Sequence, residues 1–300
     1  MTTPGMQITS PAAAHPFSRQ TAVHNAVNVI NGLSAASVGQ PDSARQVLVF
    51  MGIMAWIEPF ELQRLSLLAQ AWNARVTAVD APGCGYGGTR LTPSQRRALR
   101  CGDFAAVARQ MVLTAQAHNP QLRHGHTTVV GYSLGSSLAA AAAADPGLMR
   151  VKNMLLVEPV ALRRRTVAAL LRAVRSENRV VNEYLDLNEG IAGQVEPPQR
   201  RSEPIPPWST IDIAHLGYGL SRGQLARNLV SSRQIQRFSV QVVHGIDSTL
   251  SPPADVRSLI RQCRRDGLVM HDIAVTGRHA LWHSLSEVTK LAARVRDSLD

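Results

Sequence analysis

Short apolar runs rich in β-branched residues alternate with longer segments of helical spacing along most of the chain. This alternation is typical of a mostly parallel sheet with helices on both faces, because parallel strands need long crossovers that also cover the sheet. We therefore predict an α/β fold, with 21–30 adding an edge strand or hairpin. The predicted strands are 46–51, 75–79, 127–130, 151–157, 239–243 and 268–275, and the predicted helices are 59–72, 93–117, 134–144, 254–264 and 281–299.

One connection, between the fourth and fifth predicted strands, is far longer than a simple crossover. Its first part has one apolar helical face and places the arginines mostly on the other. The apolar face carries Val167, Leu170, Leu171 and Val174. The proline-rich stretch at 196–208 cannot continue a helix. We predict a helical cap at 161–237 over the carboxyl edge of the sheet, an α/β core formed by 19–160 and 238–300, and a flexible tail at 1–18.

The net charge of +11 comes almost wholly from arginine. A basic surface can attract anionic substrates, nucleic acid or acidic lipid. An arginine bias often reflects genomic base composition, however, so a solvated surface is the simpler interpretation and no nucleic-acid partner is expected. The sequence does not indicate an oligomeric state.

The cysteine content and the apolar runs bear on location. Three cysteines without metal-type spacing fit a reducing compartment better than a disulfide framework. The first 18 residues lack the basic start and the apolar stretch of a secretory signal. No run reaches the roughly 20 apolar residues that a membrane-spanning helix needs. We therefore expect a cytoplasmic protein with no membrane span.

The motif GYSLG at 131–135 lies directly between the apolar run TTVV and an alanine-rich helical segment. It fits the pattern G-x-S-x-G, which occurs by chance often enough that its context matters more than the pattern itself. A tight turn between strand and helix holds the central serine in a strained backbone and exposes its hydroxyl at the sheet edge. This context predicts Ser133 as a nucleophile.

At this point the chain resembles the α/β-hydrolase fold family, over about 45–159 and 238–299. The family's first long strand ends in a His-Gly segment, and the corresponding stretch here is FMGI at 50–53, with Met51 where histidine is common. The resemblance implies that the backbone N–H groups of Ile53 and Leu134 form an oxyanion hole. That role needs no particular side chain, so the loss of the histidine does not abolish it.

The next predicted strand ends in DAPGCGYG at 80–87, which is similar to the family's D-x-P-G-x-G-x-S segment with Gly87 at the usual serine position. Turns need glycine and aspartate for backbone reasons. We therefore expect Asp80 and these glycines to build tight loops and not to perform catalysis.

A serine hydroxyl needs a base, and in this family the order along the chain is serine, acid, histidine. The strand VQVVHG leads into Asp247, in a segment similar to the family's G-x-x-D but one residue shorter after the glycine. His279 follows the last predicted strand, where the family places its general base. The resemblance therefore implies a catalytic triad of Ser133, Asp247 and His279.

Other residues compete for these roles. Glu158 ends the strand after the serine helix, a position from which some relatives supply the acid, so it is the alternative to Asp247. His283 lies one helical turn beyond His279 and is the alternative base. His244 and His271 fall within or at the end of strands and are more typical of core or rim histidines.

The sequence thus predicts a serine hydrolase that cleaves an ester or related acyl bond of a small-molecule substrate through an acyl-enzyme. No cofactor is expected, because the chain has no phosphate-binding loop, no dinucleotide motif and no metal-type spacing of histidine or cysteine. The same triad could serve thioester or carbon–carbon bond hydrolysis, perhydrolysis or acyl transfer. A non-catalytic α/β-hydrolase scaffold that binds a partner through its basic cap is the alternative from another class.

Overall fold

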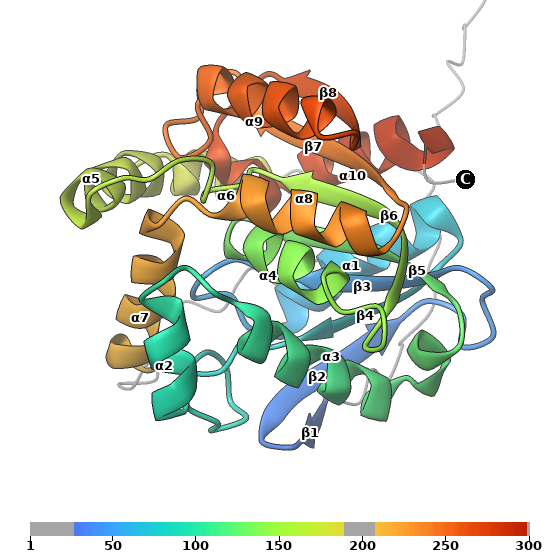
Figure 1. The fold of residues 1–300 in the computed structure, drawn as a ribbon. Helices are drawn as coiled ribbons and strands as arrows, with labels where there is room; N and C mark the ends of the chain where they lie inside the picture. The colour runs from blue at the N-terminus through green and yellow to red at the C-terminus, as the bar shows by residue number, and fades with distance from the viewer. Residues whose placement is uncertain (1–26, 189–207, 299–300) are drawn as a thin grey trace, which may run out of the picture.

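The computed structural model describes residues 27–188 and 208–298, so the predicted tail at 1–18 and most of the proline-rich stretch lie outside the described residues. A mostly parallel sheet of eight strands crosses the molecule in the order β1-β2-β4-β3-β5-β6-β7-β8, with helices on both faces (Figure 1). The predicted α/β fold is confirmed. The strands are β1 Asn28–Ile30, β2 Leu33–Val38, β3 Gln46–Phe50, β4 Arg75–Val79, β5 His126–Tyr132, β6 Arg150–Val157, β7 Ser239–Gly245 and β8 Val269–Val275.

The antiparallel edge of the sheet differs most from the sequence-based expectation. β1 and β2 form a hairpin, and β2 pairs antiparallel with β4, whereas the remaining neighbours are parallel. β1 overlaps the predicted edge segment 21–30, but the wholly buried β2 was not predicted. Its small residues pack in the interior, and the Ser37 hydroxyl is paired with the Thr77 hydroxyl at 2.8 Å.

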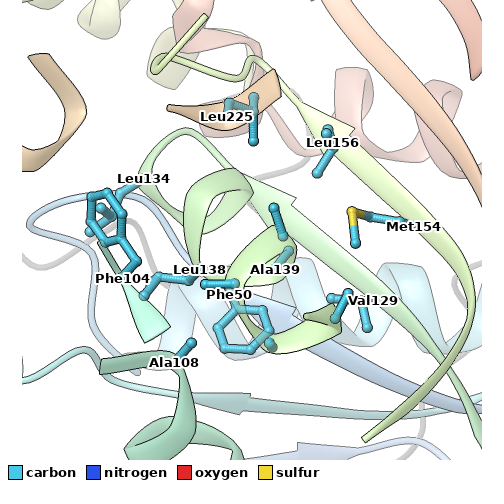
Figure 2. Close-up of a cluster of buried hydrophobic side chains, with 14 of the residues drawn as sticks. Phe50, Phe104, Ala108, Val129, Leu134, Leu138, Ala139, Met154, Leu156 and Leu225 are labelled. Carbon is cyan, nitrogen blue, oxygen red and sulfur yellow. The ribbon is translucent and has the colours of Figure 1, made fainter. Parts of the chain in front are cut away.

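The helices cover the sheet in two layers, each over its own apolar cluster. One layer contains α3, α4, α8 and α9, and the other contains α1 and α10. Figure 2 shows part of the first cluster, where Leu134, Leu138 and Ala139 of α4 lie among side chains from the strands and from α3 and α8. The bounds are α1 Pro59–Trp72, α3 Ala105–His118, α4 Leu134–Ala143, α8 Leu225–Ile235, α9 Pro253–Arg265 and α10 Leu285–Val295.

Two predicted helices have other bounds in the structure. The single helix expected at 93–117 is two helices, α2 Pro93–Leu99 and α3, because the chain turns at Gly102 with a φ of 77° that favours glycine. The last helix starts later than expected. Ser284 caps α10 by accepting a hydrogen bond from the Glu287 N–H, and a short 3₁₀ turn, His279–His283, precedes it.

Three helices of the long insertion lie against the loops at the carboxyl ends of the strands. They are α5 Val167–Asn178, α6 Val181–Asp186 and α7 Thr210–Ser221. The backbone N–H of Ser209, which caps α7, donates to the Gly83 carbonyl in the loop after β4 at 2.7 Å. A side chain of α5, Glu177, contacts the loops after β7 and β8.

The fourth helix of the insertion, α8, belongs to a different layer. The Ser232 hydroxyl donates to the Ala140 carbonyl of α4 at 2.8 Å, so α8 covers the face of the sheet in the way of a crossover helix. The cap at 161–237 stays a prediction, and this packing favours a shorter cap that ends before Leu225.

Two further expectations concern a membrane span and the location of the protein. No helix within 27–188 or 208–298 is long and apolar enough to cross a membrane. Cys84, Cys101 and Cys263 are free thiols. A cytoplasmic location stays a prediction.

Candidate active site

Ser133 lies in the sharp turn between β5 and α4. Its φ of 55° and ψ of −113° fall in a region that non-glycine residues rarely adopt. A Cβ at Gly131 would approach the Gly135 carbonyl oxygen to 2.5 Å, and a Cβ at Gly135 would overlap the Phe50 carbonyl oxygen. The two glycines of the motif therefore let the helix approach the strands closely enough to form this turn.

His279 lies beside the serine, in the 3₁₀ turn after β8. Its Nε2 is 3.0 Å from the Ser133 Oγ. The buried imidazole stacks on the Tyr132 ring, with 5.3 Å between the ring centroids, and the Tyr132 hydroxyl donates to the His279 carbonyl at 3.0 Å. Tyr132 thus fixes both the ring and the main chain of His279, a role that the sequence did not predict.

Glu158 completes a line of three residues. It directly follows β6, is fully buried, and its Oε2 is 3.1 Å from the His279 Nδ1. The carboxylate also accepts hydrogen bonds from the Gly245 N–H and from the Ser248 hydroxyl, the latter at 2.6 Å. These donors compensate for burying the charge. A carboxylate, an imidazole and a hydroxyl therefore form a continuous hydrogen-bonded line.

The strands themselves hold two members of this line. The Ser133 N–H donates to the Val157 carbonyl at the end of β6, at 3.0 Å. The Glu158 N–H donates in turn to the Val243 carbonyl of β7, at 2.8 Å. Glu158 also has a left-handed φ, of 52°. Each of the two residues is thus attached by its main chain to the neighbouring strand.

The structure does not bring Asp247 to the base, and the predicted contact between Asp247 and His279 is not formed in it. Asp247 is exposed in the turn after β7, with its N–H bonded to the Gly277 carbonyl at 3.0 Å. Among the described residues its carboxylate makes no hydrogen bond to His279. The turn directs the next side chain, Ser248, inward to Glu158 instead. Glu158, the alternative considered from the sequence, occupies the position beside the imidazole.

The two amides expected to form the oxyanion hole belong to segments next to the serine. Leu134 is the first residue of α4, and Ile53 follows Gly52, where a Cβ would lie 3.6 Å from the Ser133 Cβ. In the described part of the chain neither N–H donates to a protein acceptor. Both are available to a bound oxygen, and the α4 N-terminus favours negative charge there.

Asp80 supports the loop that carries Ile53. Its Oδ1 accepts a hydrogen bond from the Ile57 N–H at 2.8 Å, which fixes the loop from β3 to α1. Burial raises the pKa of Asp80 to about 7, against the opposing effect of this hydrogen bond. The contact agrees with the loop-building role expected for Asp80.

His283, the alternative base, also lies beside Tyr132. Its ring meets the Tyr132 ring edge-on at 6.4 Å. Burial lowers the pKa of His283 to about 3, and the nearby charges of Arg64 and His279 add to the effect. Within the described residues it has no hydrogen bond to Ser133. The geometry therefore favours His279 as the base.

The loop that carries Ile53 lies beside α7. Ile53 is partly buried against the main apolar cluster, and a Cβ at Gly217 of α7 would lie 4.0 Å from its Cδ1. The rings of Trp56 and Trp208 lie 5.7 Å apart. The loop that carries Ile53 therefore contacts α7 and the residues just before it through aliphatic and aromatic groups.

Comparisons with known proteins agree with the fold. The family model of the alpha/beta hydrolase fold matches residues 47–188. The thioesterase domain from the curacin biosynthetic pathway is similar at 20% identity and a TM-score of 0.55, over 87% of this chain and 94% of that chain. A lipase in its open form is 18% identical with a TM-score of 0.60, over 89% of this chain and 94% of that chain. E-2-(acetamidomethylene)succinate hydrolase is 19% identical with a TM-score of 0.58, over 88% of this chain and 95% of that chain. No curated protein matches the chain.

Proposed function

The chain belongs to the α/β-hydrolase fold superfamily, and from this premise we propose that it is a serine hydrolase that cleaves an ester or related acyl bond. One observation carries the proposal: the Ser133 Oγ lies 3.0 Å from the His279 Nε2, and the His279 Nδ1 lies 3.1 Å from the Glu158 carboxylate. Nucleophile, base and acid are thus in hydrogen-bonding sequence.

The proposed reaction begins with proton transfer from the Ser133 hydroxyl to the His279 Nε2 as Oγ attacks the substrate carbonyl carbon. Glu158 accepts the Nδ1–H throughout, which keeps Nε2 free as the acceptor and stabilises the imidazolium that forms. The carbonyl oxygen becomes negative and is bound by the N–H groups of Ile53 and Leu134. No side chain at position 51 is needed for this step.

The second half of the proposed reaction releases the acyl group. The His279 imidazolium donates its Nε2 proton to the leaving group, and the bond from the carbonyl carbon to that group breaks. Water then attacks the acyl-enzyme while the neutral imidazole removes its proton. The bond from the carbonyl carbon to the Ser133 Oγ breaks, and the imidazolium returns the proton to Oγ. The products are the free acid and regenerated Ser133.

The surroundings of the serine favour a small-molecule substrate with an apolar acyl group. Ile53 carries one of the two proposed oxyanion amides, so its aliphatic side chain would lie near the part of the substrate next to the carbonyl. Burying each methylene of an acyl chain there contributes about 0.8 kcal/mol to binding. Esters or thioesters of increasing chain length test this idea, since kcat/KM that does not rise with chain length would contradict an apolar acyl site.

The first experiment is covalent labelling with a fluorophosphonate, measured by intact mass. We expect a single adduct on the wild-type protein and none on Ser133→Ala, which removes the nucleophile with a minimal change in volume. Absence of an adduct on the folded wild-type protein would overturn the proposal and favour a non-catalytic binding scaffold.

A further inference from the structure

A second buried carboxylate, Glu177 of the cap helix α5, contacts the loops that carry the line of three residues. Only 2% of its surface is exposed. Its Oε1 accepts hydrogen bonds from both the N–H and the hydroxyl of Thr249, each at 2.6 Å. Its Oε2 accepts a hydrogen bond from the His279 N–H at 3.2 Å. The burial of this charge is thus compensated by groups of two different loops.

The partners of Glu177 are directly connected to the line of three residues. His279 is the proposed base itself. Thr249 is adjacent in sequence to Ser248, whose hydroxyl donates to the Glu158 carboxylate at 2.6 Å. The Thr249 carbonyl is held as well, by Arg165 at 3.2 Å. One carboxylate on the cap therefore holds the main chain on both sides of the contact between His279 and Glu158.

Helix α6 and the residues after it hold the same loop at two further points. The Tyr184 hydroxyl accepts a hydrogen bond from the Arg278 N–H at 2.7 Å. The Asn188 side chain donates to the His283 carbonyl at 2.9 Å and accepts from the Leu285 N–H at 2.7 Å. The main chain from 278 to 285 thus takes its shape from polar groups of the insertion.

Helix α5 in turn depends on Glu177 for its own position. Leu170 and Glu177 are its only buried residues among those described, whereas Val167 and Leu171 are exposed. In Figure 1 the helix extends away from the body of the molecule. With so little apolar burial, the hydrogen bonds of Glu177 are a main contact that holds α5 against the sheet edge.

We propose that Glu177 is a positioning residue that couples the location of the cap to the activation of the serine. When α5 lies against the loops, the carboxylate keeps His279 and Thr249 where the hydrogen bonds from Ser133 to His279 and from His279 to Glu158 can both form. When α5 moves away, the His279 main chain loses its acceptor and the imidazole loses its alignment. The inference rests on the proposed function and adds that the rate of the reaction depends on the position of α5.

The test compares Glu177→Gln with Glu183→Gln, a matched change at an exposed carboxylate of the next cap helix. Glutamine keeps the size of the side chain but replaces one acceptor oxygen by a donor, so it cannot satisfy both loops. We expect the rate of fluorophosphonate labelling and kcat to fall by about 10–100-fold in Glu177→Gln, with KM changed by less than about threefold. Glu183→Gln should stay within about twofold of the wild type.

A spectroscopic readout separates positioning from a loss of folded protein. The His279 Nδ1 proton, shared with Glu158, should give a low-field proton resonance in the wild type that shifts or broadens in Glu177→Gln. A folded Glu177→Gln variant with the wild-type resonance and labelling rate would overturn the inference. So would an equal fall in rate in both variants.

A second variant keeps the inference falsifiable if Glu177→Gln does not fold. Tyr184→Phe removes the hydroxyl that accepts from the Arg278 N–H in the same loop, and we expect fluorophosphonate labelling to slow by about fivefold. A wild-type labelling rate would contradict the coupling. Failure of the proposed function is distinct from these outcomes. In that case the wild-type protein itself is not labelled, while the shift of the low-field resonance in Glu177→Gln still reports the coupling.

Discussion

Tyr132 and His279 are joined twice, by stacked rings whose centroids lie 5.3 Å apart and by a hydrogen bond of 3.0 Å from the tyrosine hydroxyl to the histidine carbonyl. Tyr132 is the residue directly before the proposed nucleophile. The chain that positions the serine therefore also positions the base, although the two lie in loops far apart in the sequence.

Replacing Tyr132 by phenylalanine tests the hydroxyl contact while keeping the ring. Burial raises the pKa of Tyr132, so the hydroxyl stays protonated and remains a donor. Tyr132→Phe leaves the His279 carbonyl without this donor, and we expect a loss of about 1–3 kcal/mol in the free energy of unfolding. Urea denaturation measures this loss. An unchanged midpoint would show that another donor takes its place.

The identity of the acid can be tested with a pair of matched amide substitutions. We expect Glu158→Gln to lower kcat by about 10³–10⁴-fold, because the amide cannot stabilise the imidazolium and can hold the wrong tautomer. Asp247→Asn, at the exposed alternative, should stay near the wild-type rate. Both rates are measured on the same activated ester. The reverse order of effects would restore Asp247 as the acid.

The identity of the base can be tested in the same way with two histidines. We expect His279→Asn to abolish fluorophosphonate labelling, because no other base lies at hydrogen-bonding distance from Ser133 in the described structure. His283→Asn should be labelled within about tenfold of the wild-type rate, since its low pKa keeps it neutral and it acts only through packing. Labelling that survives in His279→Asn would contradict the assignment.

Asp80 makes stability depend on pH in a predictable direction. Its pKa is raised to about 7 in the folded protein, from an unfolded value of about 4. Its contribution to stability is therefore fully present below about pH 4 and is lost as the pH rises through about 7. Asp80→Asn keeps an acceptor for the Ile57 N–H and never ionises.

The measurement for Asp80 is the free energy of unfolding of both proteins at about pH 5 and about pH 8. We expect the wild type to become less stable relative to Asp80→Asn as the pH rises. Equal pH dependence of the two proteins would show that Asp80 does not titrate in this range.

The parts of the fold that were predictable share a strong local signal. The buried parallel strands carry runs of β-branched residues, and the two glycines around Ser133 are required by the close approach of α4 to β3 and β5. β2 escaped prediction because its small residues give little strand signal. Its buried Ser37 hydroxyl is paired with Thr77, a partner from a distant part of the chain.

The acid could not be decided from the sequence for a related reason. Glu158 and Asp247 follow adjacent parallel strands, so both reach the same edge of the sheet. The choice between them depends on a left-handed φ at Glu158 and on the turn that exposes Asp247. No sequence pattern indicates a role for Glu177, since two of its three hydrogen-bond donors are main-chain N–H groups that any residue could supply.

The attachment of Ser133 and Glu158 to neighbouring strands has a consequence for amide exchange with solvent. Their N–H groups donate to carbonyls of β6 and β7, so they exchange only when the sheet itself opens. The His279 N–H donates to the Glu177 carboxylate of α5 and becomes exposed whenever α5 moves away. Hydrogen exchange would therefore divide the three residues into two that share the global stability of the sheet and one that follows the local opening of a single helix.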